Sequence, residues 1–392
     1  MHFRFQAKSK KTKISFKALK MAKKIYLIAG EASGDLHGAN LIRHLRQESS
    51  SPLEIFGVGG DHIRQTGAKN FVDLAHFHVT GVTEAIRRLP QYRKASERIL
   101  KDIREASPDL VVLIDNPGFN LHLAQKIHAD KIPIVYYIAP QVWAWAPKRI
   151  LKIKKTIKKV LVVFEFEKKI YESNGIPVSW VGHPLKDLVT PVARKAPQTP
   201  PLICLLPGSR KGELKNLFTA FLKASVLIKR NIPEISFVLI KSSSLPKSFY
   251  ERLLKHAPVP VRLVEEDSYS VIGSSDLAIV CSGTATLECA LLGTPMIIAN
   301  RGSFLTYLVA KSLIRVPYLG LPNLILGKKK IPELLQYDAT PKKIAQEALK
   351  ILLKPKVREV MKNDLLEVSK RLGEPGANRR AALEVLSVLE NR

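Results

Sequence analysis

The sequence predicts an α/β fold with two Rossmann-like domains that face each other across a cleft. Short apolar runs typical of buried strands alternate with glycine-containing turns and helical patterns, and this order starts again after residue 201. The 392 residues exceed what one hydrophobic core usually accommodates. A proline-rich stretch separates the two halves and is typical of a linker. We expect four segments: a domain over residues 23–190, a linker over 191–201, a domain over 202–350 and C-terminal helices over 351–392.

The composition is that of a globular protein with a large positive charge. The chain has 63 Lys and Arg against 34 Asp and Glu, a net charge of +29, which favours polyanions such as nucleic acid, an anionic membrane surface or phosphorylated substrates. No apolar run approaches the roughly 20 residues that a membrane-spanning helix needs. The three cysteines, Cys204, Cys281 and Cys289, lack the spacing of a zinc site, which indicates a reducing compartment, the cytosol.

Residues 1–22 are expected to be a basic, disordered N-terminal extension. The first 20 positions contain seven Lys or Arg and no acidic residue, and no apolar segment follows them as in a secretory signal. The extension is either a tail or the product of an upstream start codon. The first domain then begins with a strand over residues 25–29.

Two turns of the first domain carry acidic side chains directly after a strand. Glu31 and Asp35 follow the first strand, where the glycine spacing differs from the dinucleotide-binding fingerprint and both acids could be helix caps. Asp115 follows a continuous apolar run over residues 109–114. The carboxyl ends of parallel strands line the ligand crevice of such folds, so Asp115 is either a general base or a cap.

Two tryptophans follow the strand expected at residues 134–138. Trp143 and Trp145 are two positions apart and are not expected to face the core together, so at least one should contact a ligand, an acyl chain or a membrane interface. Core packing of both is the alternative. His183, which precedes a proline near the domain boundary, is either a base or a structural residue.

A basic amphipathic helix is predicted after Pro147. Ile150, Ile153 and Ile157 fall on one face of this segment, and seven Lys or Arg surround them between residues 148 and 159. This helix either contacts anionic lipid headgroups or a phosphate-bearing substrate, or it is simply a solvated surface.

The second half contains a candidate diphosphate-binding turn. A strand over residues 277–281 leads into a small turn and a helix, whose N–H groups and dipole attract an anion. Glu288 lies one helical turn further on the same face, where it could accept hydrogen bonds from a ribose. An ordinary βα turn is the alternative. Arg210, which follows the strand over residues 202–206, could pair with the same diphosphate.

The last part of the chain is predicted to be mostly helical. Residues 321–324 and 331–336 are expected to form a loop and a short helix. From Thr340 the pattern is helical to the end, with breaks near Pro355 and between Gly373 and Gly376.

Seven motifs occur in order between residues 24 and 350: Gly30-Glu31-Ala32-Ser33-Gly34-Asp35, Asp115 to Asn120, Pro140-Gln141-Val142-Trp143-Ala144-Trp145, Gly182-His183-Pro184, Leu206-Pro207-Gly208-Ser209-Arg210, Ser282 to Glu288, and Leu321-Pro322-Asn323. With these motifs the chain resembles the lipid-A-disaccharide synthase family of GT-B glycosyltransferases. Each motif alone is a weak signal, but seven in sequence make a chance match remote.

The resemblance implies a specific reaction. A 2,3-diacylglucosamine unit would pass from its UDP form to 2,3-diacylglucosamine 1-phosphate, giving the β-1,6-linked lipid A disaccharide 1-phosphate and UDP with inversion. It implies no cofactor, and the absence of an Asp-x-Asp sequence agrees with no metal, since N–H groups and Arg can stabilise the diphosphate. It also implies peripheral association with the cytoplasmic face of the inner membrane and leaves open a homodimer with exchanged C-terminal segments.

The resemblance also implies roles for individual residues. Asp115 would be the base that removes the proton of the acceptor 6-hydroxyl group. The UDP side would comprise Ser209, Arg210, Ser282, Gly283, Thr284, Glu288, Asn323 and Gln336. The acceptor side would comprise Glu31, Asp35, Asn120, Gln141, Trp143 and Trp145. The chain departs from the family at Gly118, where the family usually has a second Asp, and a family proline near residues 164–167 is absent.

Two other readings compete with this one. Another GT-B enzyme, such as a UDP-sugar 2-epimerase or a transferase acting on a different lipid-linked sugar, would share the fold. The charge of +29 would also suit a nucleic-acid-binding protein, but neither a helix-turn-helix pattern nor a basic platform interleaved with aromatics occurs. We therefore expect no specific nucleic-acid partner.

Overall fold

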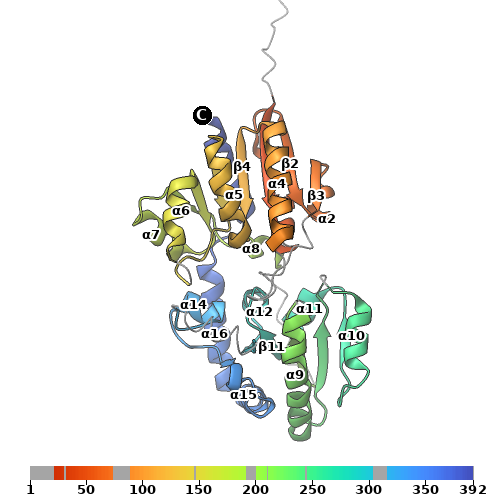
Figure 1. Ribbon diagram of the computed structural model, residues 1–392. Helices are drawn as coiled ribbons and strands as arrows, with labels where there is room; N and C mark the ends of the chain where they lie inside the picture. The colour runs from red at the N-terminus through yellow and green to blue at the C-terminus, as the bar shows by residue number, and fades with distance from the viewer. Residues whose placement is uncertain are drawn as a thin grey trace, which may run out of the picture.

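The computed structural model describes residues 22–30, 32–73, 89–144, 147–190, 200–209, 211–242, 245–302 and 316–391. These residues form two domains, the N-terminal one above the C-terminal one in Figure 1. The sequence predictions for residues 1–21 and for the linker over 191–199 lie outside the described residues.

The N-terminal domain contains a seven-stranded parallel sheet in the order β3-β2-β1-β4-β5-β6-β7. Its strands are β1 Lys23–Ala29, β2 Leu53–Gly59, β3 Lys69–Asp73, β4 Leu110–Ile114, β5 Ile134–Tyr137, β6 Lys159–Val162 and β7 Val178–Trp180. Its helices are α1 Ala32–Glu48, α2 Asp61–Arg64, α4 Leu89–Ala106, α5 Pro117–Ala129, α6 Arg149–Thr156, α7 Glu165–Glu172 and α8 Leu185–Leu188.

Both faces of this sheet are buried, which explains the continuous apolar runs of its central strands. All five side chains of β4 are buried, and they alternate between two cores. Leu110, Val112 and Ile114 pack in the core shared with α1 and the C-terminal helix, whereas Val111 and Leu113 pack in the core under α4 and α5. Helices α4 and α5 lie in front of the sheet in Figure 1.

The C-terminal domain repeats the arrangement with six parallel strands in the order β10-β9-β8-β11-β12-β13. The strands are β8 Leu202–Leu206, β9 Ser236–Ile240, β10 Arg262–Val264, β11 Leu277–Cys281, β12 Met296–Asn300 and β13 Glu333–Leu335. The helices are α9 Lys211–Asn231, α10 Lys247–Leu254, α11 Ser268–Ser274, α12 Ala285–Leu291 and α14 Leu321–Leu326, and the short 3-10 helix η1 covers Gln336–Asp338.

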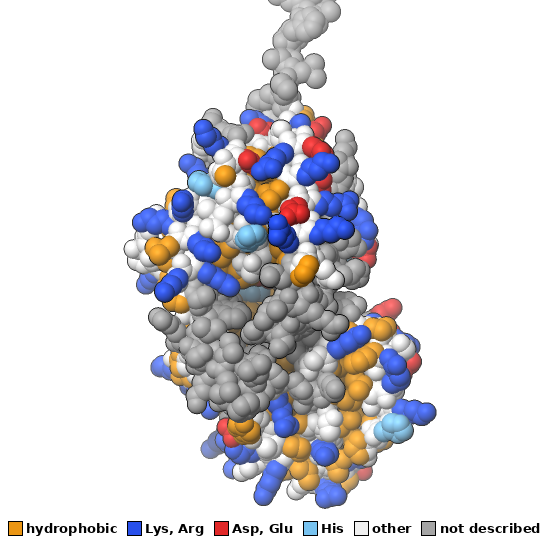
Figure 2. All heavy atoms as spheres, in the orientation of Figure 1, with side chains coloured by type: hydrophobic (Ala, Val, Ile, Leu, Met, Phe, Trp, Pro, Cys, Tyr) orange, Lys and Arg blue, Asp and Glu red, His pale blue; other side chains and the backbone are white. Residues whose placement is uncertain are grey.

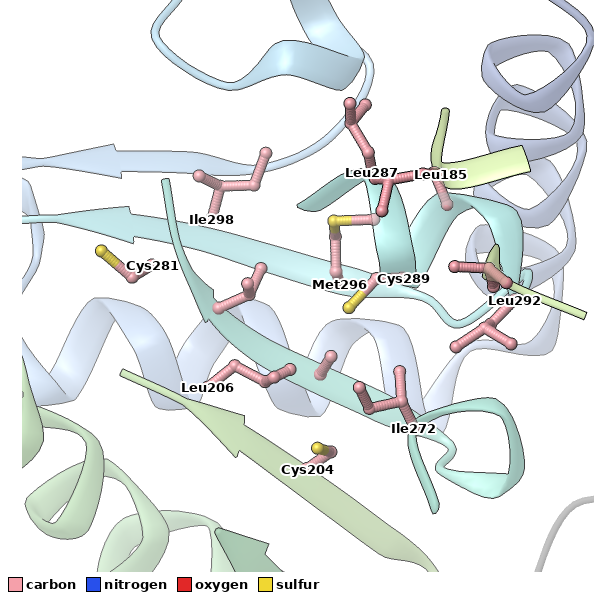
Figure 3. Packing of buried hydrophobic residues seen from close by; sticks show 14 of the residues in the cluster. Leu185, Cys204, Leu206, Ile272, Cys281, Leu287, Cys289, Leu292, Met296 and Ile298 are labelled. Carbon is pink, nitrogen blue, oxygen red and sulfur yellow. The ribbon is translucent and has the colours of Figure 1, made fainter. Parts of the chain in front are cut away.

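One element of this domain differs from the sequence prediction. Residues 331–336 were expected in a loop and short helix, but Glu333–Leu335 is a strand that pairs in parallel with β12. A strand of three residues is too short for its apolar and polar side chains to show the alternation typical of a strand. Pairing with the backbone of β12 fixes it as a strand. The three cysteines are buried and free, with their sulfur atoms inside the core in Figure 3.

The chain crosses back to the N-terminal domain at its end. Helices α15 Pro341–Leu353 and α16 Pro355–Arg371 pack on the C-terminal domain, against α9 and against α12 and α14. Helix α17 Ala377–Glu390 instead packs against α1 and covers one face of the N-terminal sheet. The carboxylate of Asp187 in α8 accepts hydrogen bonds from the N–H groups of Ala377 at 3.2 Å and Asn378 at 3.0 Å and so caps α17.

The domains meet where the carboxyl end of one sheet faces the other. Helix α8, which follows β7, contacts α12, which follows β11. In Figure 3 the side chain of Leu185 in α8 lies beside that of Leu287 in α12. The turns after the strands of both sheets therefore lie on the sides that face each other, where ligands bind in open α/β folds. None of the described helices combines the length and apolar character that crossing a bilayer requires.

Candidate active site

Two glycine turns lie side by side at the carboxyl edge of the C-terminal sheet. Strands β8 and β11 are neighbours, with Leu206 opposite Val280, so the turns that follow them are adjacent. Gly208 has φ +111° and Gly283 has φ +151°, values that a residue with a side chain rarely adopts. A Cβ atom on Gly283 would meet no atom within 4 Å, so backbone geometry and not crowding selects glycine there.

The polar residues of these turns differ in exposure. Ser209 and Thr284 are exposed, and Ser282 is half-buried and donates from Oγ to the carbonyl oxygen of Leu319 at 3.0 Å. Arg210 lies outside the described residues. Helices α9 and α12 start directly after the two turns, so backbone N–H groups from two helix starts converge at this edge.

Glu288 lies in the first turn of α12 and has an unforeseen neighbour. The hydroxyl of Tyr269 in α11 donates to Oε1 of Glu288 at 3.5 Å. Burial raises the pKa of Glu288, and the bond from Tyr269 opposes this shift. A tyrosine in an adjacent helix start gives no signal in the sequence, because only the packing of α11 on α12 brings it there.

Asn323, which the resemblance places on the UDP side, makes its hydrogen bonds within its own domain. Its side chain is fully buried, and Nδ2 donates to Ile331 O at 2.9 Å and to Oε2 of Glu333 at 3.1 Å. Its Oδ1 accepts from the N–H groups of Lys330 and Ile331, both at 2.9 Å. With both amide atoms engaged, Asn323 organises the segment that contacts Ser282. Gln336, at the carboxyl end of β13, is half-buried with φ +51°.

On the N-terminal side, Asp115 occupies a strained turn at the end of β4. Asp115 and the following Asn116 have φ values of +48° and +43°, which are uncommon for residues other than glycine. The N–H group of Asp115 donates to Tyr137 O at 3.1 Å. Its carbonyl oxygen accepts from the hydroxyl of Tyr136 at 2.6 Å. Backbone strain of this kind, held by surrounding bonds, is typical of functional sites.

Asn120, which the resemblance places on the acceptor side, supports this turn. The side chain is fully buried, and Nδ2 donates to Ile114 O at 3.1 Å and to Asp115 O at 2.7 Å. Its spacing of five residues from Asp115 is that of a side chain one helical turn into α5 that reaches back to the strand end. Asn120 therefore positions Asp115 through the backbone.

The turn after β1 lies next to the Asp115 turn, because β1 and β4 are neighbours with Ala29 opposite Ile114. A Cβ atom on Gly30 would lie 2.8 Å from Nδ2 of Asn116, so the two turns touch. Asp35 is 3% exposed, and its carboxylate accepts from the N–H groups of Gly60, His62 and Ile63 at 2.7 to 3.1 Å. Asp35 thus caps α2. Glu31 lies outside the described residues.

The loop after β5 carries the remaining sequence candidates. Gln141 and Trp143 are half-buried, and Trp145 lies outside the described residues. The indole Nε1 of Trp143 donates to Oε1 of Glu167 at 2.9 Å, and its ring meets that of Phe166 edge-on at 4.9 Å. The loop starts at Ile138, whose φ of +54° is a clear outlier for a β-branched residue.

His183 is a structural residue. It is 8% exposed, and its Nδ1 accepts from the N–H group of Leu185 at 3.2 Å. Burial, with a contribution from neighbouring His37, lowers the pKa of His183 to about 3. A neutral, buried imidazole that caps α8 agrees with the structural alternative of the sequence analysis. Among the described residues, no group of three or more His, Cys, Asp or Glu side chains is arranged to hold a metal ion.

Comparison with known proteins identifies the family to which these two facing sheets belong. A family model described as lipid-A-disaccharide synthetase matches residues 25–386. The chain belongs to the lipid-A-disaccharide synthase family. The lipid-A-disaccharide synthase of Syntrophus aciditrophicus is 38% identical over 378 residues, which cover 94% of this chain and 98% of that protein. The synthase of Geobacter sulfurreducens is 38% identical over 375 residues, covering 93% and 97%.

Solved structures agree on the fold. The UDP-GlcNAc 2-epimerase of Neisseria meningitidis bound to UDP-GlcNAc has a TM-score of 0.64 at 13% identity, covering 93% of this chain and all of that one. The calicheamicin glycosyltransferase CalG4 has a TM-score of 0.57 at 16% identity, covering 95% and 99%. The family membership confirms the predicted glycosyltransferase activity, lipid-A-disaccharide synthesis in lipid A biosynthesis, on a GT-B-like fold.

Proposed function

We propose that the chain joins UDP-2,3-diacylglucosamine to 2,3-diacylglucosamine 1-phosphate in a single displacement with Asp115 as the base. The acceptor 6-oxygen would attack the anomeric carbon as its proton passes to Asp115. The bond from that carbon to the diphosphate would break on the opposite face, and UDP would leave with the electron pair. Inversion to the β-1,6 linkage follows from attack opposite the leaving group.

The strained turn at Asp115 is the observation that carries this proposal. Two successive left-handed residues cost on the order of 1 kcal/mol or more each, and hydrogen bonds from Asn120 and Tyr136 hold the turn. A helix cap alone would not need this conformation, since caps are usually extended. The strain therefore supports a catalytic role for this carboxylate at the edge that faces the second domain.

The glycine turns after β8 and β11 support a diphosphate site opposite Asp115. Their N–H groups, with Ser209, Arg210, Ser282, Gly283 and Thr284, would bind the diphosphate and stabilise the charge that develops on it. Glu288 would hold the ribose, and the left-handed Gln336 at the end of β13 would contact the nucleotide.

Mass spectrometry of the product tests the reaction. With both defined diacylated substrates, we expect a tetraacyl disaccharide monophosphate in equimolar amount with UDP. Incubation with UDP-GlcNAc alone should leave it unchanged, which separates transfer from epimerisation. Asp115→Asn should reduce kcat by about 10²- to 10⁴-fold, with UDP affinity retained. A product other than the disaccharide would contradict the proposal.

The surface of α6 supports peripheral contact with an anionic membrane on the cytoplasmic side. Ile153 and Ile157 are buried as predicted, while Leu151 is 68% exposed among lysines of the same helix and its flanks. Figure 2 shows Lys and Arg side chains over this domain, with apolar side chains between them. An exposed leucine within a basic surface fits an interface of acyl chains and anionic headgroups.

Vesicle co-sedimentation tests this contact. Replacing Lys152, Lys155 and Lys158 together by Gln should weaken binding to vesicles that contain an anionic lipid, and raised salt should do the same to the native chain. The matched control replaces three exposed lysines of the other domain, Lys342, Lys354 and Lys356. Equal losses in both variants would contradict a specific role for α6.

A homodimer with exchanged C-terminal helices is a further part of the proposal. The contacts of α17 with α1 and Asp187 lie within one chain here, and a second chain could supply the same helix because residues 372–376 alone join it to α16. Light scattering of the purified protein tests this. A monomer at micromolar concentration would contradict it.

A further inference from the structure

Glu167 is a buried carboxylate that the reaction described above does not use. It is 1% exposed and lies in the first turn of α7. One oxygen accepts from Phe164 N at 3.2 Å, as in a capping box, and the other accepts from the Trp143 indole at 2.9 Å. The buried carboxylate of Asp35, in contrast, accepts from the main-chain N–H groups of Gly60, His62 and Ile63. Glu167, like Glu333, uses one oxygen for a side chain from another segment.

Helix α7 holds the loop after β5 at two points. Tyr171, one helical turn after Glu167, donates from its hydroxyl to Pro140 O at 2.7 Å. Tyr171 is fully buried, so this bond is shielded from water. Glu167 holds the other end of the loop through Trp143. The two residues lie four positions apart and therefore on the same face of α7.

Aromatic contacts fix the plane of the Trp143 ring. The ring meets Phe166 edge-on, with centroids 4.9 Å apart and an angle of 78°. Phe166 in turn stacks on Phe164 at 5.7 Å and 6°. With the indole N–H tied to Glu167, the ring is constrained both along its edge and by its neighbours, while it stays half-buried and open to a ligand on its remaining surface.

This cluster lies beside the proposed catalytic residue. Trp143 follows β5 and Phe164 follows β6, and both strands end at the same edge as β4, which carries Asp115. Strand β5 is bonded directly to this turn, because Asp115 N donates to Tyr137 O. The loop after β5 therefore starts next to the Asp115 turn, at the same edge of the sheet.

Stability alone does not explain a carboxylate at this position. Burial raises the pKa of Glu167 to about 7, so ionisation of this carboxyl near neutral pH lowers the stability of the folded chain. A capping box needs only one acceptor oxygen, which Gln supplies as well. The oxygen Oε1 of Glu167 accepts from the Trp143 indole.

We propose that Glu167 is a positioning residue that fixes the Trp143 ring as a contact surface for the acylated acceptor sugar beside Asp115. The inference rests on the proposed function and assigns to the loop after β5 the part of the acceptor that packs on an aromatic ring, its sugar face or the first carbons of an acyl chain. Glu167 acts on the substrate only through Trp143.

Steady-state kinetics with the full chain tests this. Gln at position 167 has one acceptor oxygen and an NH₂ group, so it cannot accept from both Phe164 N and Trp143 Nε1. Glu167→Gln should raise the acceptor KM by about tenfold, with the donor KM and kcat within about twofold. Trp143→Phe, which keeps a ring and loses the N–H group, should do the same. The double variant should match the single ones, because the two residues act through one bond.

Matched controls separate positioning from general damage. Glu165→Gln makes the same change in the same helical turn at an exposed side chain and should leave all constants unchanged. With Trp145 and Trp180 replaced by Phe, acrylamide should quench the fluorescence of Trp143 more strongly once Glu167 is Gln. This optical readout needs no substrate, so it stays informative if the wild type fails to form the disaccharide.

Three results would overturn the inference. The acceptor KM could be unchanged in Glu167→Gln, or the effects of Glu167→Gln and Trp143→Phe could add. Equal losses in every kinetic constant together with a lower melting temperature would assign Glu167 a structural role only. Failure of the wild type to form the disaccharide would instead contradict the proposed function.

Discussion

The side-chain amide of Asn120 donates to the main-chain oxygen of Asp115 at 2.7 Å, and the same nitrogen lies 3.1 Å from the oxygen of Ile114. One buried side chain therefore holds the last residue of β4 and the first residue of the strained turn. In this way Asn120 fixes the backbone from which the Asp115 side chain projects. The Asn120 amide therefore orients the proposed base without reacting itself, and its loss should affect catalysis.

Asn120→Ala should lower kcat about tenfold or more and the free energy of unfolding by about 1–3 kcal/mol. The turn loses two hydrogen bonds that oppose its strain, so Asp115 samples other orientations. Initial rates at saturating substrates and urea unfolding measure the two effects. Tyr136→Phe is the comparison, since it removes one bond to the same oxygen and leaves both bonds of Asn120. An unchanged kcat in Asn120→Ala would contradict this role.

Gly283→Ala should weaken UDP binding about tenfold, because alanine at φ +151° displaces the turn that would bind the diphosphate. Calorimetric titration with UDP measures it. Gly67→Ala is the control: Gly67 has φ +72° and open space around it but lies in the N-terminal domain. Both variants should lose some stability through strain, and only Gly283→Ala should lose affinity. Equal UDP affinities in the two would count against the site.

The ionisation of Glu167 should make stability fall as pH rises. Its folded pKa is raised from 4.5 to about 7, so its contribution is fully present below pH 4.5 and is lost as pH rises towards 7. The difference amounts to about 3 kcal/mol. Urea unfolding at pH 5 and pH 8 should show that Glu167→Gln gains stability relative to the wild type at the higher pH. The altered hydrogen bonding of the Glu167→Gln variant lowers stability by the same amount at both pH values, so it does not affect this change. If the difference in unfolding free energy between variant and wild type were the same at both pH values, the burial of an ionising group would be contradicted.

The buried imidazole of His183 should make stability fall as pH falls. Its folded pKa is lowered to about 3, so its contribution is present above pH 6.5 and is lost as pH falls below that value. His183→Asn keeps an acceptor for the N–H group of Leu185 and cannot be protonated. Between pH 7 and pH 5 the wild type should lose about 2 kcal/mol relative to this variant. Parallel pH profiles of the melting temperature would show that His183 is accessible to protons in the folded state.

The alternation of strands and helices could be predicted because both faces of each sheet are covered. Strands such as Leu110–Ile114 and Leu277–Cys281 are buried throughout and appear in the sequence as uninterrupted apolar runs. Strand β13 escaped prediction because three residues at a sheet edge carry too little pattern.

The candidate site was harder to predict than the fold, because a sequence gives the position of a polar side chain along the chain and not the direction in which it points. Asp35, Asn120 and Asn323 all lie near strand or helix ends, where ligands bind. The side chain of each forms hydrogen bonds with backbone groups, and Asn323 also bonds to the Glu333 carboxylate. For Asp35 these groups lie 25 to 28 residues away. Glu167 and Trp143, 24 residues apart, became a pair only once β5 and β6 were neighbours. Turn glycines were more reliable, because a positive φ selects the residue type at the position itself.

The docking of α17 on the N-terminal domain also constrains how the chain folds during synthesis. Ala381, Val385 and Leu389 complete a core whose other members lie in elements made much earlier, from β1 to α8, and Asp187 acquires its backbone partners only when Ala377 and Asn378 emerge. The N-terminal half therefore leaves the ribosome with one face of its sheet covered by α1 but not yet by α17, and the C-terminal domain is complete before it. The N-terminal domain is synthesised first but completes its fold last. Until α17 is synthesised, a chaperone could bind its exposed apolar side chains.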